Sequence, residues 1–363
     1  MSYQFPFKVE LESKPDYEEC MQRVYAWYDH DLLDRVPVRF SAHNAEYNVV
    51  DDKSRWKTLK DRWFDAEYQV DKYLHTVKNS VFTAETFPVF WPNLGPNVFP
   101  CIMGCQVEYG DVTTWAKHNM GELDEYADFV YDEQNEHFKK LEEMTYLALE
   151  KGKGQFTVGY TDIHHGTDCA DALRGTANLC MDMYDDPEQT LQFVRHCSEH
   201  FADFYNHFNN ILIEHRQPSV TWINIPSYES FHVPGCDLAA MLSREQFREF
   251  ILPGLKEEVK VAKHNVLHMD GTGVARHLDD FLEMPELNGI QWVQGVAEDE
   301  PIMQWVPLIQ KIQNAGKGVL VDLKVSELDD FMDAVSPLGI YLCIDSSDPE
   351  EQKTILNKLL KWK

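Results

Sequence analysis

The sequence has no long apolar run, no low-complexity tract and no CxxC pair. A membrane-spanning helix needs about 18 apolar residues in succession, so we expect a soluble chain. Eight cysteines in 363 residues are too few for a disulfide scaffold, and most are expected to be reduced and buried. The amino-terminal stretch MSYQFPFKVELESKPDYEE lacks a basic segment followed by an apolar one, so neither a secretory signal nor a transit peptide is expected. We therefore expect a cytoplasmic protein.

Basic residues are also scarce. Lysine and arginine total 33 against 61 acidic residues, which gives a formal net charge of −28. Such a surface repels nucleic acids and anionic membranes, so neither is expected as a partner. The hydrophobic content of 44% is high enough for a full core, and we expect a single domain spanning 1–363.

Short apolar segments alternate with longer helical patterns from residue 36 to the end of the chain. Apolar, β-branched runs bounded by turn residues predict eight strands, at 36–41, 80–86, 155–162, 219–225, 265–270, 289–293, 318–323 and 339–344. Strands that are apolar on both faces indicate a parallel sheet covered by helices. We therefore predict an α/β fold, the (β/α)8 TIM barrel. An open doubly wound sheet is the alternative, although no G-x-G-x-x-G motif follows an early strand.

A barrel of this kind needs about 250 residues, so about a hundred are left over. We assign them to an N-terminal helical extension at 1–34 and to long insertions after strand two (87–121) and strand four (226–242), with the barrel at 35–363. The first insertion includes the aromatic, proline-rich stretch TFPVFWPNLGPNVFPCIMG (86–104). Two interpretations are open: this stretch roofs an apolar ligand, or it forms the interface of a homodimer.

Polar residues gather at the predicted carboxyl ends of the strands, where barrel enzymes carry their active sites. We predict as catalytic residues Glu85, Tyr160, Asp162, His164 and His165. We predict as substrate-binding residues Arg39, His43, Asn224, Tyr228, Gln291, Trp292 and Asp322. A purely structural barrel has no reason to place so many ionisable groups at one end.

His268 and Asp270 lie two residues apart on a predicted strand, so their side chains point the same way. Cys343, on the last strand, belongs to the same end of the barrel. A histidine nitrogen, a carboxylate oxygen and a thiolate sulfur suit Zn²⁺ with one coordination position open, as in a catalytic site. The alternative is that His268 is a core histidine, Asp270 caps the following helix and Cys343 is a small buried apolar residue.

A second dense cluster lies in YTDIHHGTDCADALRGT, residues 160–176. The adjacent His164 and His165 diverge on an extended loop, so at most one is expected to enter a pocket. The other is expected to be solvated or to bond a helix end. Asp162 lies on the strand itself and is the candidate general base, or a carboxylate that orients a histidine.

The stretches DRVPVRFSAHNAEY, DALRGTANLCMDMYDDPE and LHMDGTG together resemble the uroporphyrinogen decarboxylase superfamily over nearly the whole chain. The resemblance implies a (β/α)8 barrel. Its decarboxylase branch opens with an RQAGR segment and has an aspartate at the end of strand two. Here these places hold Arg39, His43 and Glu85. Histidine cannot form the bidentate fork that arginine makes with a carboxylate, so the departure disfavours tetrapyrrole decarboxylation.

The other branch contains zinc-dependent methyltransferases, which pass a methyl group from a methylcobamide to a thiol. The resemblance implies zinc ligands at His-x-Cys and a distant cysteine, and here the same places hold His268, Asp270 and Cys343. A carboxylate in place of one thiolate makes zinc a stronger Lewis acid and a poorer activator of a thiol. We predict zinc or another divalent metal as cofactor, with a corrinoid as substrate or carried on a partner protein.

The leading hypothesis is a metal-dependent methyltransferase-like enzyme that moves a methyl group between a corrinoid or methylated small molecule and an acceptor. The first alternative is a decarboxylase or other lyase acting on a small carboxylate or tetrapyrrole, with Arg39 as anion anchor and Glu85 or Asp162 as acid and base. The second is a protein that binds a corrinoid or tetrapyrrole without catalysis.

Overall fold

The structure is a computed structural model that describes residues 2–40 and 53–363. Its helices are α1 (Tyr17–Tyr28), α2 (Leu59–Trp63), α3 (Ala66–Lys78), α4 (Val98–Ile102), α5 (Glu136–Lys151), α6 (Gly166–Arg174), α7 (Thr176–Asp185), α8 (Pro187–His196), α9 (Phe201–Glu214), α10 (Arg244–Gln246), α11 (Leu252–Glu258), α12 (Gly271–Ala275), α13 (Leu278–Leu282), α14 (Val306–Asn314), α15 (Leu328–Ala334) and α16 (Pro349–Leu359). Its strands are β1 (Val38–Phe40), β2 (Val89–Phe90), β3 (Val107–Tyr109), β4 (Thr114–Ala116), β5 (Thr157–Val158), β6 (Phe231–His232), β7 (His264–Asp270), β8 (Gly289–Val293), β9 (Gly318–Leu323) and β10 (Ile340–Ile344).

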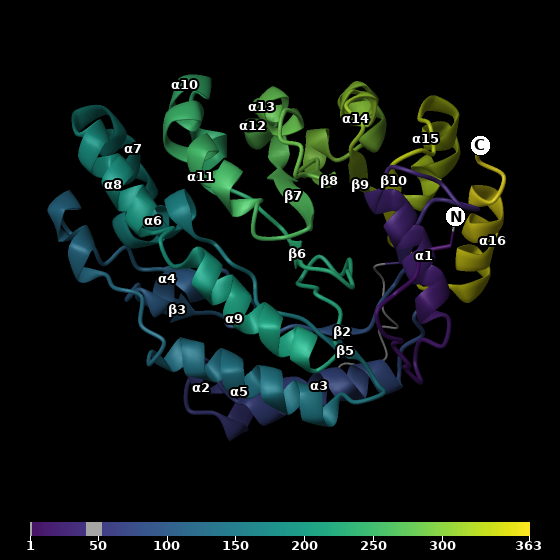
Figure 1. The fold of residues 1–363 in the computed structure, drawn as a ribbon, viewed down its shortest axis with the longest axis horizontal. Coiled ribbons are helices and arrows are strands. Elements are labelled where there is room, and N and C mark those ends of the chain that lie inside the picture. The colour runs from purple at the N-terminus through teal and green to yellow at the C-terminus, as the bar shows by residue number, and fades with distance from the viewer. Residues whose placement is uncertain (1, 41–52) are drawn as a thin grey trace.

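The main sheet has six parallel strands in the order β1-β10-β9-β8-β7-β6. A separate parallel pair is formed by β2 and β5, and β3 pairs with β4 in the antiparallel sense. The sheet is curved, and helices lie outside it, as Figure 1 shows for α12 to α15 along β7 to β10. An α/β fold with a curved parallel sheet is therefore confirmed, and closure by eight regular strands stays a prediction.

The strands from β7 to β10 lie close to their predicted bounds, but strands two and four do not, and strand three, predicted at 155–162, is regular only at Thr157–Val158. Segment 80–86 holds only a bridge between Ala84 and Arg39, and in segment 219–225 only Ser219 makes a bridge, to Ser227. The reason lies in the backbone: Ala84 and Asn224 have φ values of 53° and 56°, which interrupt an extended strand. The regular strands form further along the chain, as β2 and β6.

Isolated backbone hydrogen bonds connect the main sheet to the β2–β5 pair. The Glu85 amide donates to the Val38 carbonyl at 3.0 Å, the Thr157 amide to Pro88 at 2.9 Å, and the Tyr160 amide to Val220 at 2.9 Å. Strand β1, the residues around β2 and the residues around β5 are thereby held side by side, which places the loops after β2 and β5 near the carboxyl end of β7.

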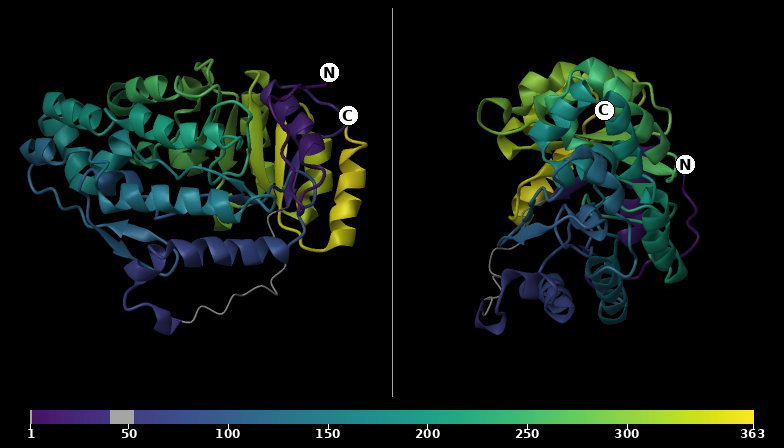
Figure 2. Two further views of the ribbon diagram at one scale, coloured as in Figure 1. Left: turned by 60° about the horizontal axis from the view of Figure 1, so that its bottom comes forward. Right: turned by 90° about the vertical axis from the view of Figure 1, so that its left-hand side faces the viewer.

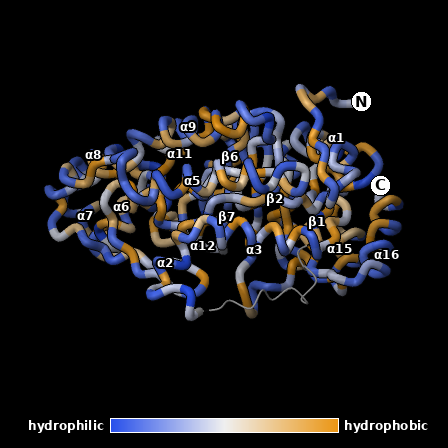
Figure 3. The backbone as a smooth tube through the Cα atoms, turned by 90° about the horizontal axis from the view of Figure 1, so that it is seen from below, coloured by the Kyte–Doolittle hydropathy of each residue, from blue (hydrophilic) through white to orange (hydrophobic). Residues whose placement is uncertain are grey.

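The outer helices are amphipathic, whereas the central strands are not. Every residue of β10 is buried, and β9 buries all but Asp322. Hydrophilic and hydrophobic colours alternate along the outer helices in Figure 3, as expected where one face packs on the sheet. Within residues 2–40 and 53–363, every helix is too short or too polar to cross a bilayer.

The predicted N-terminal helical extension contains one helix, α1, which packs under the sheet. Trp27 of α1 is 1% exposed, and its Nε1 donates to the Gly339 carbonyl at 2.9 Å. A Cβ atom at Gly289 or Gly318, the first residues of β8 and β9, would lie 2.7 Å or 2.6 Å from the indole. Both strands therefore begin with glycine because Trp27 fills the space. Both chain termini lie near this helix (Figures 1 and 2).

Replacing Trp27 by alanine should lower the free energy of unfolding by about 3–5 kcal/mol, because a large aromatic side chain leaves a cavity that two strand glycines cannot fill. Urea unfolding at neutral pH measures the change. Trp115→Ala is the matched control, since Trp115 is 56% exposed and should leave the midpoint nearly unchanged. Equal midpoints for the two variants would show that Trp27 does not anchor the strands.

The aromatic insertion 86–104 is buried within its own chain. Phe87, Phe90 and Phe99 are at most 6% exposed. The exposed aromatic patch from which a homodimer was predicted is therefore not present, and a homodimer stays a prediction without that support. Two residues of the insertion, Trp91 and Pro96, instead line a cavity, which agrees with the interpretation of a roof over a ligand.

Candidate functional site

A cavity of about 300 Å³ lies at the carboxyl ends of the parallel strands. Its walls come from segments that follow β2, β5 and β6, from Trp222 in the segment before β6, and from the carboxyl half of β7. The lining residues are Trp91, Pro96, Asp162, Ile163, His164, Trp222, Val233, Gly235, Asp237 and His268. In α/β proteins with parallel sheets, ligands bind at the carboxyl ends of the strands.

A histidine held between two carboxylates forms one wall of the cavity. His164 Nε2 lies 2.9 Å from Asp162 Oδ2, and its Nδ1 lies 3.5 Å from Asp168 Oδ2. Asp168 also accepts the backbone amides of Asp237 and Leu238, each at 3.0 Å. These bonds connect the loop after β5 to the loop after β6 and fix the imidazole ring between them.

The two carboxylates keep His164 charged. Burial alone would lower its pKa, but the charge and hydrogen bond of Asp162, together with Asp168, raise the pKa well above 6.5. Burial alone would raise the pKa of Asp162, but the charge and hydrogen bond of His164 lower it below 3.8. At neutral pH the wall therefore presents an imidazolium to the cavity. The contact of Asp162 with His164 is compatible with one of the two roles predicted for Asp162, the orientation of a histidine.

This charge arrangement makes the free energy of unfolding depend on pH. Because the pKa of His164 is raised in the folded chain, its stabilisation is complete below pH 6.5 and is lost as pH rises through the folded value. The difference in free energy of unfolding between the wild type and His164→Gln should therefore shrink as pH rises above 6.5. Denaturant unfolding over a pH series measures it. A difference that is constant or grows with pH would contradict the charged state.

His268 is held in a fixed orientation by its neighbour on β8. His268 pairs with Gln291 in the strand register, and its Nδ1 lies 2.8 Å from Gln291 Oε1. The ring meets Trp222 edge to face, with centroids 5.1 Å apart. The Nε2 atom is thereby left to interact with a ligand, which is the geometry that a metal-binding histidine needs.

His268 and two carboxylates bring three possible metal-ligand atoms together. One atom each of Asp237, His268 and Asp270 lies within 4.8 Å of the other two. Among the described residues, a second such group is His164, Asp168 and Asp237. Because His164 is engaged by carboxylates on both nitrogens, the first group is the better candidate for a metal. Asp237 was missed by the sequence analysis, since nothing local places residues of the 226–242 insertion beside β7.

Cys343 lies in another polar cluster, with Arg39 and Asp322. Arg39 Nε donates to Cys343 Sγ at 3.3 Å, and the Arg39 guanidinium also donates to the Ile223 carbonyl. Burial raises the pKa of the Cys343 thiol to about 11, with Arg39 opposing the rise. The two metal-compatible groups found among the described residues do not include Cys343. Only two of the three predicted metal ligands are thus brought together. His43 lies outside the described residues.

Glu85 lies inside the fold, with no exposed surface, and not in the cavity wall. Its carboxylate accepts two bonds from Arg35, at 2.7 and 3.1 Å, one from the Val38 amide at 2.8 Å and one from Arg23 at 3.3 Å. These partners come from α1 (Arg23), from the residue Arg35 before β1 and from β1 itself (Val38). The predicted catalytic residue is therefore placed as the centre of a buried ion network.

Four more predicted residues also lie away from the cavity. The Tyr160 hydroxyl is buried and donates to the Phe231 carbonyl at 2.9 Å. The Tyr228 ring stacks on Phe5 of the N-terminal segment, with centroids 4.4 Å apart. Trp292 is fully buried against Trp305 because it alternates with the inward-facing Gln291 along β8. Asn224 sits at the turn that ends strand four and is not among the lining residues.

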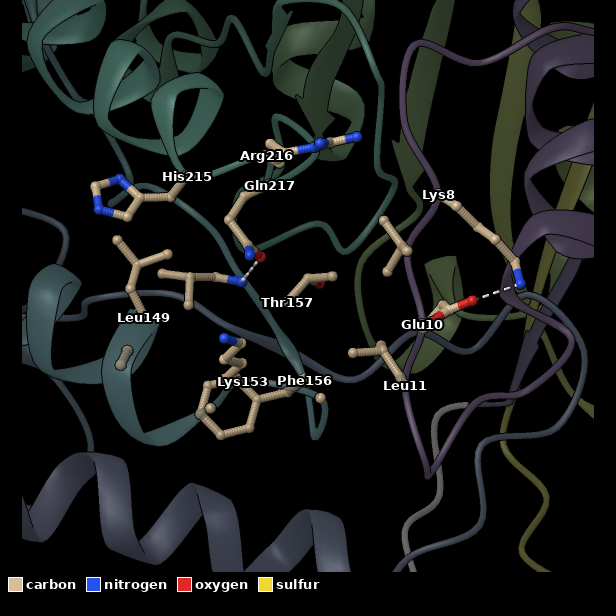
Figure 4. Close-up of a pocket in the computed structure, with 15 residues that line it drawn as sticks. Lys8, Glu10, Leu11, Leu149, Lys153, Phe156, Thr157, His215, Arg216 and Gln217 are labelled. Carbon is tan, nitrogen blue, oxygen red and sulfur yellow. Dashed lines mark hydrogen bonds and ion pairs between the residues drawn. The ribbon is translucent and has the colours of Figure 1, made fainter.

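Figure 4 shows a different cavity, of about 330 Å³, beside the N-terminal segment. Basic side chains such as Lys8, Lys153 and Arg216 line it, and Lys8 pairs with Glu10 at 2.7 Å. It lies at β5 itself, with Thr157 in its wall, and so before the loop that carries Asp162 and His164. Residues at the amino ends of barrel strands generally serve stability, so this cavity is not the candidate catalytic site.

The fold and the cavity define an α/β protein with a polar site at the carboxyl ends of its parallel strands. No protein-family model matches the chain, and no curated protein matches it by sequence. Among solved structures, the chain is similar to a methyltransferase from Methanosarcina mazei, with a TM-score of 0.61 and 13% identity. The similarity covers 94% of this chain and 98% of that one. At this identity the likeness establishes a shared fold.

Proposed function

We propose that the chain is a methyltransferase-like enzyme that uses a divalent metal at His268. The observation that carries the proposal is the convergence of His268, Asp270 and Asp237 at the carboxyl end of β7, beside an open cavity. The similarity in fold to a methyltransferase supports it. The resemblance of the sequence to zinc-dependent methyltransferases points to the same position in the chain.

The donor set fits a divalent cation. His268 offers a nitrogen while Gln291 holds its other nitrogen, and Asp237 and Asp270 offer carboxylate oxygens. One nitrogen and two oxygens form a harder set than thiolates do, and they suit zinc or manganese rather than copper(I). A metal in this place would supply Lewis-acid activation of a substrate oxygen or sulfur. Cys343 could bind the same metal only if its thiol lost its proton and its hydrogen bond with Arg39 were broken. It therefore stays a predicted ligand.

The remaining groups of the cavity define the substrate by class. Trp91, Pro96 and Trp222 offer apolar walls that suit a methyl group or a small aliphatic body. Both nitrogens of His164 are engaged by Asp162 and Asp168, so a polar group of the substrate would be bound by the metal instead. We therefore propose a small substrate with an apolar body and one oxygen or sulfur that reaches the metal. The methyl donor or acceptor would be a corrinoid, free or carried on a partner protein.

The lyase alternative has less support from these contacts. Arg39, its proposed anion anchor, already donates to Cys343 and to the Ile223 carbonyl and is not among the residues that line the cavity. Glu85, one of its two proposed acid–base groups, is bonded to arginines on both oxygens. Asp162 is the one member of that set in the cavity wall.

A methyl-transfer assay tests the proposal. The zinc-loaded chain is mixed with methylcobalamin and 2-mercaptoethanol, and loss of the methyl–cobalt bond is followed by visible absorbance. We expect turnover that a chelator abolishes and that zinc restores. Turnover unaffected by the chelator would refute metal dependence. Carbon dioxide release from small carboxylates with no methyl transfer would favour the lyase instead.

Replacing Gln291 by leucine should weaken metal binding by about 10–100-fold, because the residue that orients a metal-binding histidine is lost. Competition with a fluorescent zinc chelator measures the affinity. Gln294→Leu is the matched control, since Gln294 follows the same strand and bonds the carbonyls of Glu300 and Asp322 instead. Unchanged affinity in Gln291→Leu would show that His268 does not bind the metal in the orientation described.

A further inference from the structure

Asp237, which completes the proposed metal site, lies in a loop and not on a strand. It is the first residue of a short 3-10 helix (Asp237–Met241) that follows β6. Among the described residues, no hydrogen bond or ion pair fixes its carboxylate, whereas Gln291 fixes the ring of His268. The place of the Asp237 carboxylate therefore depends on how the backbone of this loop is held.

The 3-10 helix receives no cap from the residue before it. The first amides of a helix have no partner inside the helix, and a side chain at the preceding position usually accepts from them. Here that position holds Cys236, whose side chain accepts from neither amide. The amides of Asp237 and Leu238 therefore need an acceptor from elsewhere in the chain.

Asp168, in the first turn of α6, supplies both acceptors. Its Oδ2 accepts the Asp237 amide and its Oδ1 accepts the Leu238 amide, each at 3.0 Å. Cys236 Sγ also donates to Oδ1, at 3.3 Å. Hydrogen bonds from backbone amides to a carboxylate are stronger than those between neutral groups. Asp168 thus caps a helix that begins 69 positions further along the chain.

The other end of the loop is tied to β7. The His268 amide donates to the Pro234 carbonyl at 2.8 Å, and Gly235 forms a parallel bridge with His268. The loop is thereby held between β7 on one side and Asp168 on the other. Loss of the Asp168 contacts would release the end that carries Asp237 and leave the end at Pro234 in place.

The Asp168 carboxylate itself has little capacity left for a metal. Its Oδ1 accepts from Leu238 and Cys236. Its Oδ2 accepts from Asp237 and lies 3.5 Å from His164 Nδ1. The side chain is only 10% exposed. Asp168 belongs to the second metal-compatible group, but a cation bound there would compete with all of these contacts.

We propose that Asp168 is a positioning residue of the metal site. It does not bind the metal, and it sets the metal affinity by holding Asp237 in place. This role rests on the proposed function, since it requires a metal held by His268, Asp237 and Asp270. It adds a residue of another helix, outside the lining of the cavity, to the groups that determine the site.

Replacing Asp168 by asparagine should weaken zinc binding by about 10–100-fold, as expected when a residue that orients a metal ligand is lost. Asparagine has nearly the same shape but one acceptor oxygen in place of two, so one amide loses its partner. Competition with fluorescent zinc chelators of graded affinity measures the change. Asp171→Asn, on the same helix, is the matched control. Asp171 belongs to neither metal-compatible group, and this variant should bind zinc as the wild type does.

A double-mutant cycle with Asp237 separates positioning from other effects of Asp168 on the metal. In an Asp237→Ala background the ligand is already absent, so the further change Asp168→Asn should alter the zinc affinity by less than about twofold. A loss as large as in the wild-type background would overturn the proposal, because Asp168 would then act as a ligand or through its charge. Wild-type affinity in the single variant Asp168→Asn would overturn it too.

Hydrogen exchange in the metal-free chain distinguishes a failure of this role from a failure of the proposed function. The peptide that contains the Asp237 and Leu238 amides should exchange faster in Asp168→Asn than in the wild type, and at the wild-type rate in Asp171→Asn. Asp168→Glu keeps the charge but displaces the carboxylate, so it should behave in the same way, and it replaces Asp168→Asn if that variant does not fold. Unchanged exchange, with zinc bound by the wild type, would refute the role of Asp168 alone. Faster exchange in a chain that binds no zinc would overturn the proposed metal and the positioning role with it.

Discussion

Replacing His268 by alanine is expected to weaken metal binding by more than about 100-fold while the fold is retained. Loss of a residue that merely orients a metal ligand costs about 10–100-fold, and loss of the ligand itself costs more. The fold should survive because His268 is only partly buried and its side chain bonds Gln291 alone among hydrogen-bond partners of the described residues. Equilibrium dialysis against buffered zinc measures the affinity, and thermal unfolding without metal measures the fold.

His215→Ala provides the control for a lost histidine, since His215 is exposed and lines the cavity of Figure 4. It should bind zinc as the wild type does. If His268→Ala binds zinc equally well, the metal is held elsewhere, and His268 with Asp270 becomes a substrate-binding or acid–base pair. Asp270→Cys should retain zinc and favour thiol methylation, because it restores the His-x-Cys pattern of the zinc-dependent methyltransferases that this sequence resembles.

Replacing Glu85 by alanine is expected to lower the free energy of unfolding by about 3–5 kcal/mol, because it leaves a buried cation without its partner. Arg35 is 7% exposed, and Glu85 is its one carboxylate partner among the described residues. The network connects α1, the residues before β1 and the segment after Ala84, so its loss affects the whole edge of the sheet. Urea unfolding measures the change.

The same variant distinguishes a structural Glu85 from a catalytic one. A catalytic acid or base can be removed with little effect on stability, so an inactive Glu85→Ala with a wild-type unfolding midpoint would contradict the structural role. Glu10→Ala is the control, because Glu10 pairs with Lys8 on the surface and should leave the midpoint unchanged.

The central strands could be predicted from the sequence because a strand that is covered on both faces consists mostly of apolar residues. The residues of β8, β9 and β10 are apolar on both faces, and their bounds agree with the prediction to within one residue. Strand two could not be placed, because alanine gives no sign of the positive φ at Ala84. In strand four, Asn224 is of a residue type enriched at positive φ, but that signal is too weak to break a predicted strand. Hydrophobic periodicity reports burial and not the backbone turn that interrupts a strand.

The site was predictable where it lies on strands. His268 and Asp270 share a direction because of the two-residue period of β7. Asp162 was predicted to lie on its strand, but it lies in the loop four residues after the end of β5. The same period points Gln291 toward His268 and Trp292 toward the helices outside the sheet. Neighbouring residues of one strand point to opposite faces, so the prediction that both bind substrate was inconsistent. The prediction that His164 and His165 diverge agrees with their separate cavities.

Asp237 and Cys343 show where sequence reasoning ended. Asp237 reaches β7 through the loop after β6, which is held by amide bonds to Asp168 across 69 and 70 positions of the chain. Such long-range bonds have no local signal. Cys343 has the expected strand position, but its register partner is Asp322 and its neighbour across the sheet is Arg39, so its sulfur is engaged there.

Anomalous X-ray diffraction from a crystal of the zinc-loaded chain, recorded at the zinc absorption edge, tests the central claim most directly. It locates the metal without reference to activity. The account predicts one strong anomalous peak per chain, in coordination distance of His268, Asp237 and Asp270. No peak at this place, or a peak bound by Cys343 away from Asp237, would contradict it.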